Sequence, residues 1–262
     1  MTAKEQKELL DFSKNLAMRA GEMLRKGFNR TLKVRYKGRI NPVTNLDVKA
    51  EKFITNAITR AYPDHEILAE EGTDSESESK YRWVIDPIDG TVNFTHAFPV
   101  YAVSIGLTYD GRPELGAVYD PDRDELFWAA RGRGAYLNKQ KISVTSESKL
   151  ERALVATGFA YDIGSARRNN LGLFSRMAKK AQGVRRLGSA ALDLCWLASG
   201  RLDGFWELKL HPWDTAAAVV VVEEAGGKVT RLDRKAYSIF DKEILATNGK
   251  LHRAMSRVLT SG

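Results

Sequence analysis

Residues 83–91 read Trp-Val-Ile-Asp-Pro-Ile-Asp-Gly-Thr and form the most informative stretch of the chain. The apolar residues before Asp86 predict a buried strand. We expect it to end at Asp86-Pro87, because proline cannot donate a hydrogen bond to a neighbouring strand. Asp86 and Asp89 lie three residues apart on a backbone that must turn, so both carboxylates can face one point. The same turn can expose the carbonyl oxygen of Ile88.

This turn offers the oxygen ligands that Mg²⁺ prefers, together with room for several waters. Gly90-Thr91 follows where a helix could begin, and the free N–H groups of a helix start bind phosphate well. A metal beside such a helix start is the arrangement that phosphoryl chemistry needs. Read alone, however, Asp-Pro and Asp-Gly are common turn signals, and the segment is more often structural than metal-binding.

Carboxylates at the ends of three other predicted elements favour the metal-binding interpretation over the structural one. Glu70-Glu71 follow a short predicted strand. Asp214 begins an alanine- and valine-rich helix, and Asp47 lies in the first turn of another helix. Each has a structural alternative, either as a solvated pair or as a carboxylate that favours a helix N-terminus through the dipole. Because unpaired charge is costly to bury among apolar and aromatic neighbours, a shared cation explains the combination better.

The first half of the chain predicts two helices and an antiparallel meander. A capping box over residues 2–5 begins a helix whose apolar residues recur at helical spacing to about Gly27. A second helix is expected from near Thr44 until Pro63 ends it. Strands are expected at residues 66–69, 100–109, 114–119 and 125–130.

The second half alternates helices with short strands. Its pattern is α/β, whereas the pattern of the first half is α+β. No linker separates the halves, so we predict a single domain over residues 1–262, with subdomains of about 1–145 and 146–262 packed face to face. The expected helices lie near 169–182, 189–199 and 214–225, and the expected strands near 153–156, 204–207, 227–231 and 244–247.

The composition narrows the classes of function. The net charge of +8 favours anionic partners, but the basic residues form no long run, so nucleic acid is not expected as the primary partner. No apolar stretch reaches the roughly 18 residues of a membrane span, so no membrane location is expected. Cys195 is the single cysteine, which suits a reducing cytoplasm. The histidines lack the spacing of a zinc site.

Taken together, the motifs resemble those of the inositol monophosphatase family, the lithium-sensitive, Mg²⁺-dependent phosphatases. The family's first signature is similar to residues 83–94, and its second to residues 213–227. Residues 42–47 and 69–71 match two further motifs, in order and over nearly the whole chain. Residues 185–194 are similar to the bacterial members in particular.

The resemblance implies a fold and a cofactor. The fold is α+β, a five-layer αβαβα sandwich, in a protein that is usually a homodimer. Two to three Mg²⁺ ions per site are implied. Glu70, Asp86 and the Ile88 carbonyl hold the first ion. Asp86, Asp89 and Asp214 hold the second, and a third, weaker ion lies near Glu70.

The resemblance also implies how a phosphate ester is cleaved. A metal-activated water attacks in line, without a phospho-enzyme. Thr91, hydrogen-bonded to Asp47, orients that water and helps to take its proton beside the ion at Glu70. The N–H groups of Gly90 and Thr91 hold phosphate oxygens.

For the departing alcohol, the resemblance implies contacts from Asp89, Ala190 and Glu207. Glu207 also has a structural alternative, as an ordinary glutamate at the end of a strand. Arg186 could meet a second anionic group of the substrate, and a surface or subunit-contact role is an equal alternative.

The function that follows is a phosphomonoesterase acting on a small polyol or sugar phosphate, with myo-inositol 1-phosphate as the first candidate. Fructose 1,6-bisphosphate, histidinol phosphate, NADP and 3′-phosphoadenosine nucleotides are alternatives from the same family. A different-class alternative is a non-catalytic regulatory or RNA-associated binding protein. Such a protein should have lost ligands, whereas every expected carboxylate and the threonine remain.

Overall fold

Two β-sheets alternate with three layers of helices. The computed structural model describes residues 1–75 and 78–261. The larger sheet has the strand order β10-β9-β8-β7-β6-β5-β3-β4, and the smaller sheet has the order β12-β11-β13-β15-β14. A separate hairpin joins β1 and β2.

Within the described residues, the α-helices are α1 (Ala3–Gly27), α2 (Asn45–Ala61), α3 (Thr91–Thr95), α4 (Leu171–Ala178), α5 (Ala190–Ala198), α6 (Pro212–Glu224) and α7 (His252–Thr260). The first strands are β1 (Val34–Tyr36), β2 (Pro42–Thr44), β3 (Glu66–Ala69), β4 (Asp74–Ser75), β5 (Tyr81–Asp89), β6 (Ala102–Tyr109), β7 (Arg112–Asp120) and β8 (Glu125–Ala130). The remaining strands are β9 (Ala135–Leu137), β10 (Gln140–Ile142), β11 (Leu154–Thr157), β12 (Gly183–Arg185), β13 (Gly204–Leu208), β14 (Lys228–Thr230) and β15 (Glu243–Thr247).

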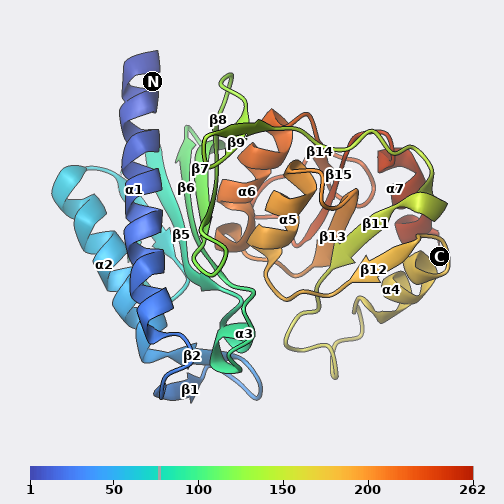
Figure 1. Cartoon of the computed structure of the whole chain (residues 1–262), viewed down its shortest axis with the longest axis horizontal. Helices are drawn as coiled ribbons and strands as arrows, with labels where there is room; N and C mark the ends of the chain where they lie inside the picture. The colour runs from blue at the N-terminus through green and yellow to red at the C-terminus, as the bar shows by residue number, and fades with distance from the viewer. Residues whose placement is uncertain (76–77, 262) are drawn as a thin grey trace.

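Figure 1 shows the layers in sequence, from α1 and α2 through the larger sheet to α5 and α6, then the smaller sheet, then α4 and α7. Three large apolar clusters lie between these layers: one joins α1 and α2 to the larger sheet, one surrounds α5 and α6 between the two sheets, and one joins the smaller sheet to α4 and α7. The predicted α+β, five-layer αβαβα sandwich is therefore confirmed. The helices of residues 1–75 and 78–261 include none that combines the length and apolar character that a membrane crossing needs.

Helix α1 covers one face of the larger sheet with a single apolar stripe. The backbone N–H of Glu5 donates to Thr2 Oγ1 at 3.2 Å, and the Thr2 N–H donates to the Glu5 carboxylate at 3.1 Å. This is the predicted capping box. Leu9, Leu16 and Leu24 follow at helical spacing and are buried against the sheet. Local sequence thus fixes both where this helix begins and which face it buries.

Strand β5 does not end where the sequence predicted. We expected the strand to stop at Asp86-Pro87, but it runs through Asp89. Its pairing with β6 shifts register between Asp86, which lies opposite Ser104, and Asp89, which lies opposite Ala102. Pro87 falls in this irregularity, where a residue without an N–H interrupts no regular ladder bond. The prediction was wrong because a bulge, and not a strand end, accommodates the proline.

Helix α6 packs closely on the opposite face of the larger sheet. A Cβ atom added to Gly116 would lie 2.2 Å from the carbonyl oxygen of Ala217. One added to Gly106 would lie 2.9 Å from the Ala217 nitrogen. Only glycines on the sheet allow this approach. The approach brings the first turn of α6, which carries Asp214, to the end of β5.

The smaller sheet is mixed, so the α/β pattern predicted for the second half is only partly right. β11 runs parallel to β12 and β13, whereas β15 is antiparallel to β13 and β14. Residues 231–242, which join β14 to β15, contain no helix, and a connection without a crossover helix permits an antiparallel return. Helix α7 was not among the predicted helices. The subdomain division near residue 145 stays a prediction.

Candidate metal centre

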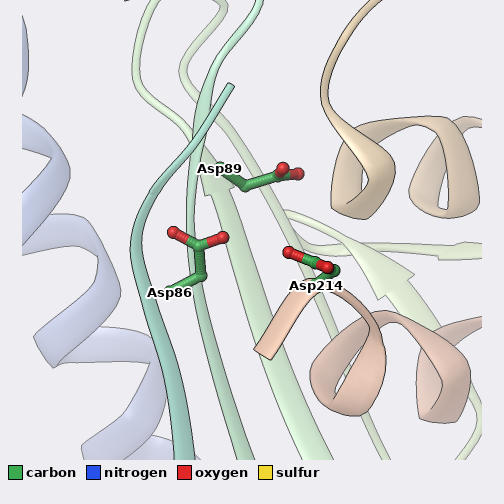
Figure 2. Close-up of side chains that lie close together, drawn as sticks. All are labelled: Asp86, Asp89 and Asp214. Carbon is green, nitrogen blue, oxygen red and sulfur yellow. The ribbon is translucent and has the colours of Figure 1, made fainter. Parts of the chain in front are cut away.

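Three aspartates meet at the centre of the site (Figure 2). One carboxylate oxygen of each lies within 4.8 Å of an oxygen of the other two. Asp86 and Asp89 come from the bulged end of β5, and Asp214 comes from the first turn of α6. Figure 2 shows the three side chains around one space. The structure thus brings together three carboxylates that the sequence predicted to be metal ligands, from segments more than a hundred residues apart.

Hydrogen bonds at their base orient the two aspartates of β5. The Ile88 N–H donates to Asp86 Oδ1 at 2.9 Å, which holds the carboxylate over the bulge. Asp89 is held from the other half of the molecule: Ser189 Oγ and the Ala191 N–H donate to its Oδ2 at 2.6 and 2.7 Å. The N-terminus of α5 therefore fixes Asp89 in place.

Asp214 serves its helix and the site together. The His211 N–H donates to Asp214 Oδ2 at 2.6 Å, which completes a capping box at the start of α6. The structural alternative considered for Asp214, a carboxylate that caps a helix N-terminus, is thus confirmed, but it does not account for the whole position of the side chain. The same carboxylate also reaches the cluster.

The electrostatics of the cluster fit a divalent cation. Burial, followed by repulsion from Glu70 and Asp89, raises the pKa of Asp86 well above its ordinary range. Burial raises the pKa of Asp89 to about 6, although its hydrogen bonds from Ser189 and Ala191 lower it. Burial also raises the pKa of Asp214, and the charge of Asp89 adds to the effect. Crowded, buried carboxylate oxygens are the hard ligands that Mg²⁺ prefers.

Glu70 lies beside the three aspartates rather than among them. It lines the same cavity, and it raises the pKa of Asp86 through its charge and a hydrogen bond. Lys37, on the segment between β1 and β2, donates to Glu70 at 3.1 Å and to Glu71 at 2.6 Å. Burial raises the pKa of Glu71 to about 7. The predicted acidic pair is therefore neutralised in part by a lysine that the sequence did not single out.

Asp47 and Thr91 form the predicted pair. Thr91 Oγ1 lies 3.1 Å from Asp47 Oδ1 and 2.9 Å from the Ile88 carbonyl oxygen, and its one proton can serve either acceptor. The Thr44 N–H donates to Asp47 Oδ2 at 2.8 Å, within a capping box that begins α2. Burial raises the pKa of Asp47 to about 6. A buried carboxylate with a poised hydroxyl can orient a water and accept its proton.

Sequence analysis missed Glu51, which holds the segment after β3. The Glu71 N–H donates to Glu51 Oε2 at 2.6 Å. The N–H and hydroxyl of Thr73 donate to Oε1 at 3.1 and 2.8 Å. Glu51 follows Asp47 by one helical turn on α2, and that spacing is the only signal in the sequence that could have found it. One helix thus positions both Asp47 and the strand end that carries Glu70.

The expected alcohol contacts line the same cavity as the cluster, and its volume is about 510 Å³. Ala190, Arg186 and Glu207 all border it. Glu207 is 8% exposed, and burial raises its pKa to about 8. Gly158 leaves it room, because a Cβ there would lie 2.2 Å from Glu207 Oε1. Asp193 borders the same space and was given no role by the sequence.

Comparison with known proteins agrees with this geometry. The model of the inositol monophosphatase family matches residues 5–261. A Synechocystis protein named inositol-1-monophosphatase is 43% identical over 254 residues, covering 96% of this chain and 88% of its own. A Pseudomonas aeruginosa protein named Nus factor SuhB is 40% identical over 254 residues, covering 94% of each. The solved inositol monophosphatase of Anabaena (Nostoc) sp. PCC 7120 is similar with a TM-score of 0.89 at 42% identity, covering 97% of this chain and 95% of that one.

Proposed function

Because this chain belongs to the inositol monophosphatase family, and is therefore a phosphatase of phosphate monoesters, we propose that its substrate is the monophosphate of a small polyol. The first candidate is myo-inositol 1-phosphate, which relatives named inositol-1-monophosphatase support. One observation carries the proposal: the cluster of Asp86, Asp89 and Asp214 lies in the same cavity as Thr91, which is hydrogen-bonded to Asp47.

The proposed cofactor is Mg²⁺, with two to three ions per site. Glu70, Asp86 and the Ile88 carbonyl would hold one ion. Asp86, Asp89 and Asp214 would hold another, with Asp86 shared between the two. When bound, the metal supplies positive charge that polarises phosphate oxygens and makes water more acidic. The buried, mutually repelling carboxylates support this assignment.

The residues of the chain then position the phosphate and the attacking water. Thr91 orients the water, and Asp47, with its pKa raised to about 6, accepts a proton through that hydroxyl. The N–H groups of Gly90 and Thr91, at the start of α3, donate hydrogen bonds to phosphate oxygens and so hold the phosphate beside the aspartate cluster. Gly90 has a φ of 98°, and a Cβ there would lie 2.8 Å from the Val100 carbonyl oxygen, so the turn requires glycine.

The wall of the cavity that carries Ala190 and Glu207, which we call the alcohol side, receives the departing alcohol. We assign Ala190 and Glu207 on this side, together with Asp89 of the aspartate cluster, to contacts with its hydroxyl groups, because all three border the cavity. Arg186 is assigned to a second anionic group of the substrate, where one is present. The same wall would accept a sugar, histidinol or nucleotide phosphate in the alternative substrates of the family.

A second candidate function is a regulatory binding role beside the phosphatase activity, and a relative named Nus factor SuhB is the observation that favours it. The homodimer stays a proposal from the family resemblance, and the cytoplasmic location stays a proposal from the single cysteine.

A phosphate-release screen tests the proposed function. Inositol, sugar, histidinol, NADP and nucleotide phosphates would each be offered with Mg²⁺, and with EDTA as the control. We expect the highest kcat/KM for myo-inositol 1-phosphate and no release in EDTA. Equal or greater turnover of a nucleotide phosphate would replace the proposed substrate.

A further inference from the structure

Asp193 is a buried carboxyl that no structural contact accounts for. It lies in the first turn of α5, is 1% exposed, and lines the same cavity as the aspartate cluster and Glu207. Its Oδ1 atom has no hydrogen-bond partner within residues 1–75 and 78–261. Unsatisfied polar atoms at this depth are uncommon and costly, so one that borders a cavity calls for an explanation.

A capping role in α5 does not explain Asp193, because other groups already satisfy the start of that helix. The Ala191 N–H donates to Asp89 at 2.7 Å, and the Leu192 N–H donates to Ser189 Oγ at 3.3 Å. The N–H of Asp193 itself donates to the Ser189 carbonyl oxygen at 3.0 Å. Helix α5 is complete without the Asp193 carboxyl, which stays available to a ligand.

The charges around Asp193 favour a neutral ligand that donates hydrogen bonds. Burial, then the negative charges of Glu207 and Asp89, raise the pKa of Asp193, whereas the charge of Arg186 lowers it. Glu207, on β13, is a second buried carboxyl that borders the cavity. A carboxyl group with a raised pKa still keeps a carbonyl oxygen that accepts hydrogen bonds from hydroxyl groups.

We propose that Asp193, beside the Glu207 already assigned to the alcohol, accepts a hydrogen bond from a further hydroxyl group of the departing alcohol, and so adds to the discrimination between polyhydroxylated and simple alcohols. This inference rests on the proposed function and deepens it. Helix α5 then has two roles one turn apart: its N-terminus fixes Asp89 of the metal cluster, and Asp193 contacts the alcohol. Selection of this kind is strong, because an alcohol with no hydroxyl group besides the one that carries the phosphate leaves the buried acceptors unpaired.

A matched pair of substrates tests the proposal. Glycerol 1-phosphate and n-propyl phosphate differ only in two hydroxyl groups, so the ratio of their kcat/KM values isolates the hydroxyl contacts. Asp193→Leu, which removes both acceptor oxygens, should lower this ratio by about tenfold or more. Asp193→Asn keeps one acceptor and should lower it by about threefold. The thermal midpoint should not fall in either variant, because Oδ1 makes no hydrogen bond that could be lost.

Asp203→Asn is the matched control. Asp203 is also buried, but it accepts hydrogen bonds from Thr145 Oγ1 at 2.6 Å and from the Leu154 N–H at 2.8 Å, and it does not line the cavity. This variant should lose thermal stability and keep the substrate ratio. An unchanged ratio in both Asp193 variants, or an equal loss on the two substrates, overturns the inference while leaving the phosphatase function intact. Failure of the wild-type protein to release phosphate from any substrate of the screen with Mg²⁺ overturns both.

Discussion

The two walls of the cavity hold their carboxylates in opposite ways. On the metal side, Asp86, Asp89 and Asp47 each accept hydrogen bonds from backbone N–H groups or hydroxyls of the chain. On the alcohol side, the carboxyl oxygens of Glu207 and Oδ1 of Asp193 receive none from the described residues. Reacting atoms need fixed geometry, whereas a specificity wall must leave its acceptors for the ligand. Substitutions on the metal side should therefore abolish turnover, and those on the alcohol side should change selection.

Asp89→Asn should have the largest effect, a loss of phosphate release of about 10²–10³-fold or more. The amide can still accept hydrogen bonds from Ser189 and Ala191, so the fold should survive while the charge of the cluster falls. Phosphate release with Mg²⁺ and the thermal midpoint would be measured together. Near-normal turnover in a folded variant would remove Asp89 from the metal site.

Thr91→Val keeps the shape of the side chain and removes the hydroxyl that contacts Asp47. We expect kcat to fall by about 10²-fold with little change in KM, because the hydroxyl orients the attacking water rather than the substrate. Steady-state kinetics on myo-inositol 1-phosphate would separate the two constants. A change confined to KM would instead place Thr91 among the substrate contacts.

Glu207→Ala tests the alcohol wall. The ratio of kcat/KM for myo-inositol 1-phosphate over that for n-propyl phosphate should fall by about tenfold, since a hydroxyl acceptor is lost and the metal cluster is untouched. Comparison with Asp89→Asn makes the contrast between the walls directly measurable. If every phosphate ester lost turnover equally, Glu207 would belong to the frame of the site.

Glu51→Gln should act on metal affinity rather than on chemistry. Weaker hydrogen bonds to Glu71 and Thr73 loosen the segment after Glu70, so the Mg²⁺ concentration at half-maximal rate should rise by about three- to tenfold. The rate at saturating Mg²⁺ should stay close to that of the wild type. Glu223→Gln, which breaks an ion pair with Arg131 far along α6, is the matched control and should leave the Mg²⁺ dependence unchanged.

The smallest expected effect is the pH dependence of stability. The pKa values of Asp47 and Asp89 are raised to about 6, so without metal these carboxyls stabilise the fold at low pH. That contribution is lost as pH rises from their ordinary values through about 6. Mg²⁺ binds only the deprotonated groups, so the gain in thermal midpoint from Mg²⁺ over EDTA should grow between about pH 5.5 and 8, to about 5 °C. A gain that shrinks with pH would contradict the assignment of these carboxyls.

Local signals predicted most of the fold. The capping box at Thr2 and the 3.6-residue apolar spacing of α1 act within one element, and β3 spans the predicted residues 66–69. The course of β5 beyond Pro87 was not predicted, because the bulge depends on pairing with β6. The antiparallel β15 depends likewise on its neighbours in the sheet.

The site residues also fall into those that local sequence predicts and those that it does not. The candidate metal ligands lie in short motifs whose residue types indicate their chemistry directly. Glu51 and Asp193 did not, because their significance comes from partners gained or lacking in the folded chain, and one sequence carries no record of either.

The close fit of α6 on Gly106 and Gly116 has a consequence for biosynthesis. Asp86 and Asp89 leave the ribosome long before Asp214, and their cluster closes only when α6 docks on a sheet made from the first half of the chain. A nascent chain that ends before α6 cannot assemble the cluster. Activity is therefore withheld until the two halves have joined, and contacts of such long sequence separation form late in folding. A metal that binds only the joined state would then pull the last folding step to completion.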